Sequence, residues 1–162
     1  MLESQPAYVT QTRLIELPFP NTSSQLNKPA DTYAFVREGL ESLPQEHGVV
    51  LCLTTKHRVV HTEVVSKGTL NCTVVMPRDV FRIAIQANAA TVVFCHNHPS
   101  GNPEPSQEDL TVTHNLYLSG KVVGIPLLDH LIVGRDGFVS LKETHPHLFS
   151  MPLPTTRKRR PK

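Results

Sequence analysis

Apolar positions along the chain alternate between short runs typical of strands and spaced positions typical of helices. Runs rich in β-branched residues predict strands over residues 48–54, 59–65, roughly 69–76, 91–95, 127–133 and 138–141. Apolar residues at three- and four-residue spacing predict helices over about 31–43, with Asp31 as the cap, over 77–88, and from Ser106 onward. This mixture predicts an α/β (α+β) sandwich of two or three layers, with a mixed central sheet and flanking helices.

The helix that begins at Ser106 carries one stripe of residues expected to face the sheet. Its members recur at helical spacing: Asp109, Val112, Thr113, Leu116 and Gly120. If this stripe faces the sheet, the Asp109 carboxylate points inward from the first turn, and Gly120 lets the helix approach the sheet closely. The helix over 77–88 keeps its polar residues on a single line, so we expect it to be deeply packed.

Candidate chemistry gathers where the strand over 91–95 ends. Side chains alternate along a strand, so His96 and His98 point to one side and Asn97 to the other. Two imidazoles and the Asp109 carboxylate, joined by a tight loop, suit a divalent metal of the zinc type. Ser106-x-x-Asp109 also resembles a helix capping box, and the two interpretations are compatible. Ser106 can cap the helix and still present its hydroxyl to a substrate.

Several blocks of the sequence resemble a known family. His96-x-His98-Pro99 followed by Ser106-x-x-Asp109 resembles the JAMM motif of the MPN (JAB) metalloprotease fold. The wider sequence is most similar to the RadC-like branch, through the blocks Gly68–Asn71, Pro77–Arg82, His96–Gly101, Pro105–Asp109 and Gly124–Gly134. The resemblance covers about residues 45–143 and implies the cytidine-deaminase-like sandwich of the MPN/JAB fold.

The resemblance also implies a zinc-dependent hydrolase. It would hold one Zn²⁺ per chain through His96, His98 and Asp109, and cleave a peptide or isopeptide bond in a peptide or protein conjugate. Three protein ligands leave a fourth zinc position for water, whose pKa falls to about 7. Such an enzyme needs a carboxylate that takes a proton and returns it to the leaving amine, and a donor for the developing oxyanion. Ser106 is positioned for the donor role.

Three glutamates are candidates for the carboxylate that moves the proton. The residues alone do not decide between Glu41, Glu46 and Glu63. In the JAMM pattern the catalytic glutamate follows the first helix and directly precedes the first strand. The resemblance therefore favours Glu46, with Glu63, on a half-exposed strand, as the second choice.

Two further residues are expected near the metal without binding it. His130 belongs to a RadC-like block, and it either supports the metal ligands or the substrate, or is a hydrogen-bonded strand residue. Asn97 is expected to organise the loop or the strand end. The cysteines lie mostly within apolar strands, and are predicted to be reduced core thiols: Cys52, Cys72 and Cys95.

Positive charge is concentrated at the C-terminal end of the sequence. The 162 residues include 16 Lys and Arg against 14 Asp and Glu, and five of the basic residues fall within 157–162, which leaves 11 against 14 elsewhere. The body is therefore no basic platform for nucleic acid, and a weak DNA contact would run through the tail at 157–162. The alternative functions are a DNA repair or recombination accessory protein and a metal-stabilised, non-catalytic binding module.

The length suits one domain with extensions at both ends. We expect an extended or disordered arm over 1–30, the RadC-like MPN/JAB domain over 31–143, and a Pro-rich and basic tail over 144–162. RadC-like proteins carry a small helix-hairpin-helix-like domain before the metal domain, for which this sequence has no room. No signal peptide and no membrane-length apolar run are evident, so we predict a cytoplasmic protein without a membrane partner.

Overall fold

A mixture of helices and strands forms the described part of the chain. The computed structural model describes residues 24–68, 75–150 and 152. The strands are β1 (His47–Leu53), β2 (Val59–Lys67), β3 (Thr91–Asn97), β4 (Leu127–Gly134) and β5 (Gly137–Ser140). The helices are α1 (Pro29–Leu40), α2 (Pro77–Gln86), α3 (Gln107–Val123) and α4 (Leu141–Thr144), followed by a 3-10 turn at Pro146–Phe149. None of these helices has the length and apolar character needed to span a membrane.

The strands form one mixed sheet in the order β2-β1-β3-β4-β5. Strands β3 and β4 run parallel, and the other neighbouring pairs are antiparallel. The predicted sandwich with a mixed central sheet is therefore confirmed. Of the strand expected over 69–76, residues 69–74 lie outside the described part, and the remaining two precede α2 without strand structure. Residues 1–23 of the expected arm, Cys72 and the basic residues at 157–162 also lie outside it.

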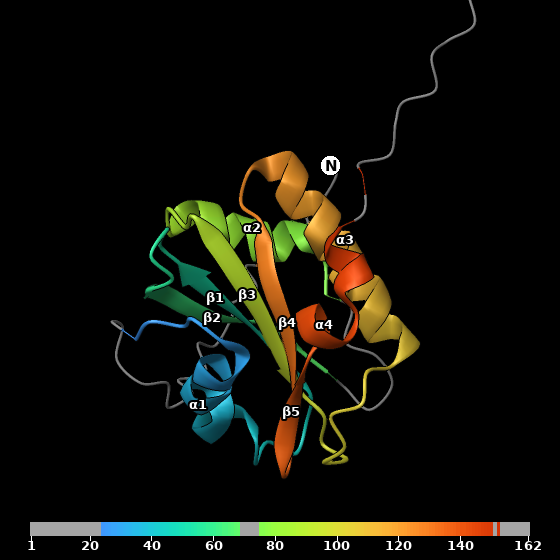
Figure 1. Cartoon of the computed structure of the whole chain (residues 1–162). Coiled ribbons are helices and arrows are strands. Elements are labelled where there is room, and N and C mark those ends of the chain that lie inside the picture. The colour runs from blue at the N-terminus through green and yellow to red at the C-terminus, as the bar shows by residue number, and fades with distance from the viewer. Residues whose placement is uncertain (1–23, 69–74, 151, 153–162) are drawn as a thin grey trace, which may run out of the picture.

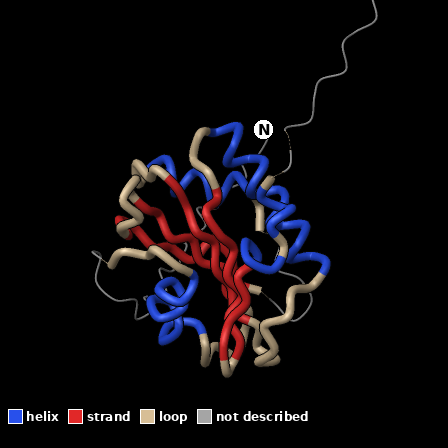
Figure 2. Tube along the Cα trace, viewed as in Figure 1, coloured by secondary structure: helices blue, strands red, loops and turns tan. Residues whose placement is uncertain are grey.

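Helices cover both faces of the sheet, because alternate residues of its central strands are apolar on both sides. Val49, Leu51 and Leu53 of β1 belong to a core shared with α1. Val50 and Cys52 of the same strand belong to a second core shared with α2 and α3. Figure 1 shows α1 on one side of the sheet and α2 and α3 on the other, and Figure 2 shows the strands as a continuous central layer. The sandwich thus has three layers.

The prediction that Asp31 caps the first helix is wrong. Lys28 occupies the cap position, and Pro29 is the first helical residue, where its fixed φ and missing N–H are tolerated. Asp31 lies in the first turn, and its carboxylate accepts hydrogen bonds from the backbone N–H groups of Asn27 and Lys28, at 3.0 and 3.2 Å. The carboxylate thus satisfies two backbone donors that precede the helix from a position inside the helix.

The second helix is shorter and less buried than predicted. It ends at Gln86, and the Ile85 side chain is 57% exposed. Only the side of α2 that carries Val80, Phe81, Ile83 and Ala84 is buried against the sheet and α3. An amphipathic helix that covers one face of a three-layer sandwich keeps a face exposed to solvent. The single row of polar residues in the sequence predicted a narrower exposed face than the structure has.

The inward stripe of α3 is placed as predicted, and Gly120 packs closely against the start of β4. A Cβ atom at Gly120 would lie 2.6 Å from the Ile125 carbonyl oxygen and 3.2 Å from the Leu127 nitrogen. Both are backbone atoms, which cannot move away by a side-chain rotation. We expect Gly120→Ala to lower the free energy of unfolding by roughly 1–3 kcal/mol, despite the better helix propensity of alanine.

Equilibrium denaturation with urea measures this effect. Gly137→Ala is the matched control, because a Cβ atom there meets nothing within 4 Å. Equal stability of the two variants would show that α3 can move outward without loss.

Candidate metal centre

Strand β3 delivers two histidines to one end of the sheet. Its residues are buried throughout, and Phe94 lies on the side that faces α2 and α3. His96 continues that side, and it is only 2% exposed. His98 follows the last strand residue, and its backbone N–H still donates to the Val133 carbonyl at 2.9 Å. Pro99, which has no N–H, then ends the pairing.

The loop after β3 returns the chain to the same place at the start of α3. Ser106 is the N-cap of this helix, and Asp109 is its third residue. The Asp109 Oδ2 atom accepts hydrogen bonds from the Ser106 N–H and the Ser106 hydroxyl, each at 2.7 Å. The Asp109 N–H donates back to Ser106 Oγ at 3.2 Å. The capping box therefore holds the Asp109 carboxylate in an inward position. The same carboxylate both completes the capping box and faces His96 and His98.

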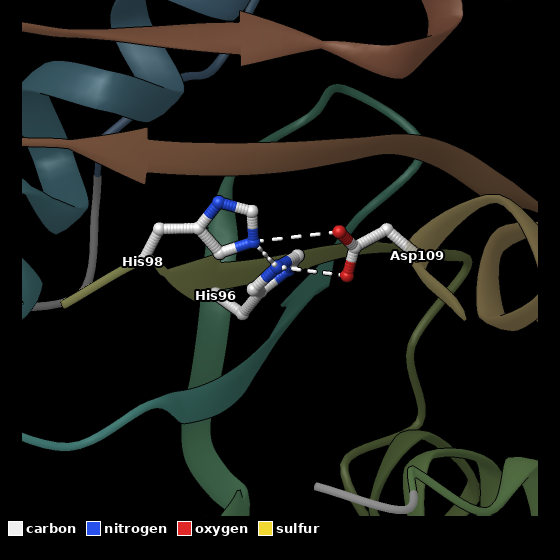
Figure 3. A group of neighbouring side chains, drawn as sticks. All are labelled: His96, His98 and Asp109. Carbon is white, nitrogen blue, oxygen red and sulfur yellow. Dashed lines mark hydrogen bonds and ion pairs between the residues drawn. The ribbon is translucent and has the colours of Figure 1, made fainter. Parts of the chain in front are cut away.

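Two imidazole nitrogens and one carboxylate converge at this point, as Figure 3 shows. His96 Nε2 lies 3.0 Å from His98 Nε2 and 3.0 Å from Asp109 Oδ1. His98 Nε2 lies 3.4 Å from Asp109 Oδ2. Among the described residues, these three form the group of His, Cys, Asp and Glu side chains that could hold a metal ion.

The spacing of these atoms fits a small divalent cation. A tetrahedral zinc site has bonds of about 2.0–2.1 Å, which places neighbouring ligand atoms about 3.3 Å apart. The observed separations of 3.0–3.4 Å bracket that value. Two nitrogens and one oxygen are also a donor set of the kind zinc takes, whereas calcium and magnesium take oxygen ligands. The three side chains can therefore hold a metal ion.

The electrostatics of the group are those of a carboxylate between imidazoles. Burial would raise the pKa of Asp109, but hydrogen bonds from His96 and His98 hold it well below its usual range. The hydrogen bond to Asp109 raises the pKa of His98, and the nearby charge of Glu46 adds to this rise. A partly buried negative charge therefore faces the point where the two imidazole nitrogens meet, which favours a cation there.

The far nitrogen of each ligand ring has a partner of its own. His98 Nδ1 lies 2.8 Å from the Asn102 carbonyl oxygen, to which it donates. With its proton on Nδ1, His98 keeps a free lone pair on Nε2. His96 Nδ1 lies 2.8 Å from Nε2 of His130, which is completely buried. Burial and the neighbouring His96 lower the pKa of His130 well below its ordinary value, so that this ring is neutral.

Glu46 lies beside this group. It comes directly before β1, whose residue Gly48 pairs with His96 of the antiparallel strand β3. Glu46 is half-buried, and its carbonyl oxygen accepts a hydrogen bond from the Gly68 N–H at 2.8 Å. Its charge is close enough to raise the pKa of His98.

The other candidate glutamates are engaged elsewhere. The Glu41 carboxylate accepts from Arg37 Nε at 2.6 Å, on the outer side of α1. The Glu63 carboxylate lies 3.0 Å from His61 Nε2 on strand β2. Of the three glutamates considered, Glu46 is the one whose charge raises the pKa of a candidate metal ligand, His98.

Asn97 holds the segment that carries Glu46. Its Oδ1 atom accepts from the His47 N–H at 2.8 Å. Its Nδ2 atom donates to the carbonyl oxygens of Leu43 and Gln45, at 3.3 and 3.1 Å. Asn97 itself is 1% exposed, on the face of β3 opposite to His96. The side chain of Asn97, at the end of β3, thus fixes the backbone on both sides of Glu46.

We expect Asn97→Leu to lower the free energy of unfolding by roughly 1–3 kcal/mol, because it leaves the buried His47 N–H unpaired. Equilibrium urea denaturation measures the change. Asn115→Leu, at an exposed position of α3, is the control for the substitution itself. A stability equal to that of the wild type would mean that water or a shifted backbone replaces the three bonds.

Sequence reasoning gave Thr113 only a packing role, although its hydroxyl lies 2.6 Å from His130 Nδ1. The only signal was its position four residues after Asp109 on the inward stripe. The two described cysteines are buried and free, as predicted. Burial raises the pKa of Cys52 to about 12 and that of Cys95 well above its ordinary value, which favours the protonated thiol over the reactive thiolate.

Comparison with known proteins adds the following. The family model described as "RadC-like JAB domain" matches residues 26–146. A UPF0758 protein of Geobacillus sp. (strain WCH70) is 48% identical over 118 residues, which are 73% of this chain and 52% of the relative. A UPF0758 protein of Bacillus mycoides (strain KBAB4) is 42% identical over 137 residues, 85% of this chain and 60% of the relative. The chain thus spans between half and two thirds of the length of these relatives.

Proposed function

The chain belongs to the RadC-like JAB domain family, and from this premise we propose that it is a zinc-dependent hydrolase that cleaves a peptide or isopeptide bond. The observation that carries the proposal is the convergence of two imidazole nitrogens and one carboxylate within 3.0–3.4 Å. Three protein ligands are the number that catalytic zinc sites use, while structural sites use four.

When bound by His96, His98 and Asp109, zinc would lower the pKa of a water molecule to about 7 and polarise a carbonyl oxygen. The residues around it supply the rest of the chemistry. Glu46, whose charge is close enough to raise the pKa of His98, would take a proton from the attacking water and return it to the leaving amine. Asn97 holds the backbone around Glu46 in register with the metal ligands.

Ser106 donates to the developing oxyanion in this proposal. Ser106 is an exposed residue at the start of α3, so a substrate can approach it. Its single hydroxyl proton is given to Asp109 Oδ2, and it must turn away from that oxygen to reach a substrate. The Ser106 N–H continues to hold Oδ2 while the hydroxyl turns, so Asp109 keeps its position. Ser106 therefore supports one ligand through its backbone and serves the substrate through its side chain.

A metal-dependent screen tests the proposal. The protein is assayed against fluorogenic peptides and isopeptide-linked conjugates in three forms: stripped with a chelator, stripped and reloaded with zinc, and reloaded as Glu46→Gln. We expect hydrolysis only in the reloaded wild type. Hydrolysis that survives chelation, or that Glu46→Gln retains in full, would contradict the proposed function.

A further inference from the structure

A buried chain of hydrogen bonds runs behind His96 and returns to the metal group. His96 Nδ1 lies 2.8 Å from His130 Nε2, and His130 Nδ1 lies 2.6 Å from Thr113 Oγ1. Thr113 Oγ1 in turn lies 2.6 Å from the backbone carbonyl oxygen of Asp109. His130 and Thr113 are completely buried, and His96 is 2% exposed. The chain thus begins at one candidate ligand and ends on the backbone of another.

With both rings neutral, as metal binding by His96 requires, the protons of this chain can be arranged in only two ways. Each neutral imidazole carries one N–H, and the Thr113 hydroxyl carries one O–H. In the first arrangement Thr113 donates to the Asp109 carbonyl and accepts from His130 Nδ1–H. His130 Nε2 then accepts from His96 Nδ1–H, and His96 Nε2 keeps a free lone pair. In the second arrangement Thr113 donates to His130 Nδ1, and the Asp109 carbonyl loses its donor. The bond between the two rings then reverses, so that the proton of His96 lies on Nε2.

Only the first arrangement allows His96 to bind a metal. A ligating ring nitrogen must carry a free lone pair, and the other nitrogen sets which one is free through its own hydrogen bond. In the second arrangement the Nε2 proton of His96 points to Asp109 Oδ1 at 3.0 Å, into the space that a cation would occupy. The side chains of His96, His130 and Thr113 are all buried, so solvent water cannot readily replace a lost hydrogen-bond partner.

We propose that Thr113, acting through His130, is a positioning residue that selects the metal-binding tautomer of His96. The proposal rests on the proposed function in that the site must hold a cation. It assigns a task to two residues that do not touch the cation and come from different elements, α3 and β4. Asp109 contributes twice, through its carboxylate as a ligand and through its carbonyl as the last acceptor of the chain.

Competitive zinc titration of matched variants tests this proposal. Thr113→Val keeps the shape of the side chain but removes its hydroxyl, so His130 Nδ1–H loses its acceptor. We expect zinc to bind about 10–100-fold more weakly, the range typical for partners of metal ligands. Thr113→Ser restores the hydroxyl and should bind close to the wild-type affinity.

Thr111→Val is the control on the same helix. The Thr111 hydroxyl makes the same kind of bond, to the Gln107 carbonyl at 2.9 Å, but it lies on the exposed side of α3. We expect its zinc affinity to equal that of the wild type. Circular dichroism and thermal unfolding of the zinc-free proteins show whether each variant is folded.

Nitrogen-15 NMR of the histidine rings gives a readout that a purely structural role would not move. In the zinc-loaded wild type, His96 and His130 should both carry their proton on Nδ1. The zinc-free wild type should already carry both protons on Nδ1. In zinc-free Thr113→Val, where His130 Nδ1–H has no acceptor, the nearby Asp109 carboxylate should draw the proton of His96 to Nε2.

The outcomes separate the two proposals. A wild-type protein that takes up no zinc overturns both of them. Zinc uptake with equal affinity in the wild type and Thr113→Val overturns only the positioning role of Thr113 and His130. A zinc-loaded protein in which His130 carries its proton on Nε2 would also overturn that role alone.

Discussion

Replacing Glu46 with glutamine is expected to lower the turnover of any cleaved substrate by about 10²–10⁴-fold, the usual contribution of a positioned acid or base. Glutamine keeps the shape of the side chain but cannot accept a proton at neutral pH. Glu46 is not one of the three candidate ligands, so zinc content should be unchanged. Steady-state kinetics and elemental analysis of the same preparation measure both quantities.

Glu63→Gln is the matched control for this prediction. Glu63 lies on strand β2, and its carboxylate is paired with His61. We expect its turnover to stay near that of the wild type. The reverse result, with turnover lost in Glu63→Gln and kept in Glu46→Gln, would move the base to β2.

Removing the Asp109 carboxylate is expected to abolish stable zinc binding. Asp109→Ala deletes the only negatively charged ligand of a three-ligand site, so the loss should exceed the 10–100-fold typical of partners outside the ligands. Because a ligand that binds only the folded state raises its stability, zinc should increase the thermal midpoint of the wild type and not that of Asp109→Ala. Zinc titration followed by thermal unfolding measures both effects.

Ser106→Ala separates the ligand role of Asp109 from its capping role. Both substitutions break the capping box at the start of α3. Losing the Ser106 cap should reduce stability by roughly 1 kcal/mol, while zinc binding persists. If both variants retained zinc equally, Asp109 would be a capping residue and nothing more.

The positions of the three candidate metal ligands could be predicted because they depend on local periodicity. Alternation along one strand places His96 and His98 on the same side, and helical spacing turns Asp109 inward. Both patterns are short-range, and nothing in the tertiary structure overrides them. The structure accordingly brings the three side chains together with no rearrangement of the expected elements.

The supporting contacts could not be predicted, because they join segments far apart in the sequence. Asn97 binds backbone groups of residues 43–47, about fifty positions away. Thr113 meets His130 only because α3 packs against β4, and its sequence context is that of a packing residue. The Asp31 error has a different origin. Aspartate suits both the cap and the first turn, and the neighbouring Pro29 decides between them.

The most direct test is X-ray diffraction from zinc-soaked crystals, recorded on both sides of the zinc absorption edge. We expect one anomalous peak at bonding distance from His96 Nε2, His98 Nε2 and an Asp109 carboxylate oxygen, with a fourth side left free of protein. No peak at this position, or an Asp109 side chain turned to solvent while zinc binds elsewhere, would contradict the metal centre and the hydrolase proposed from it.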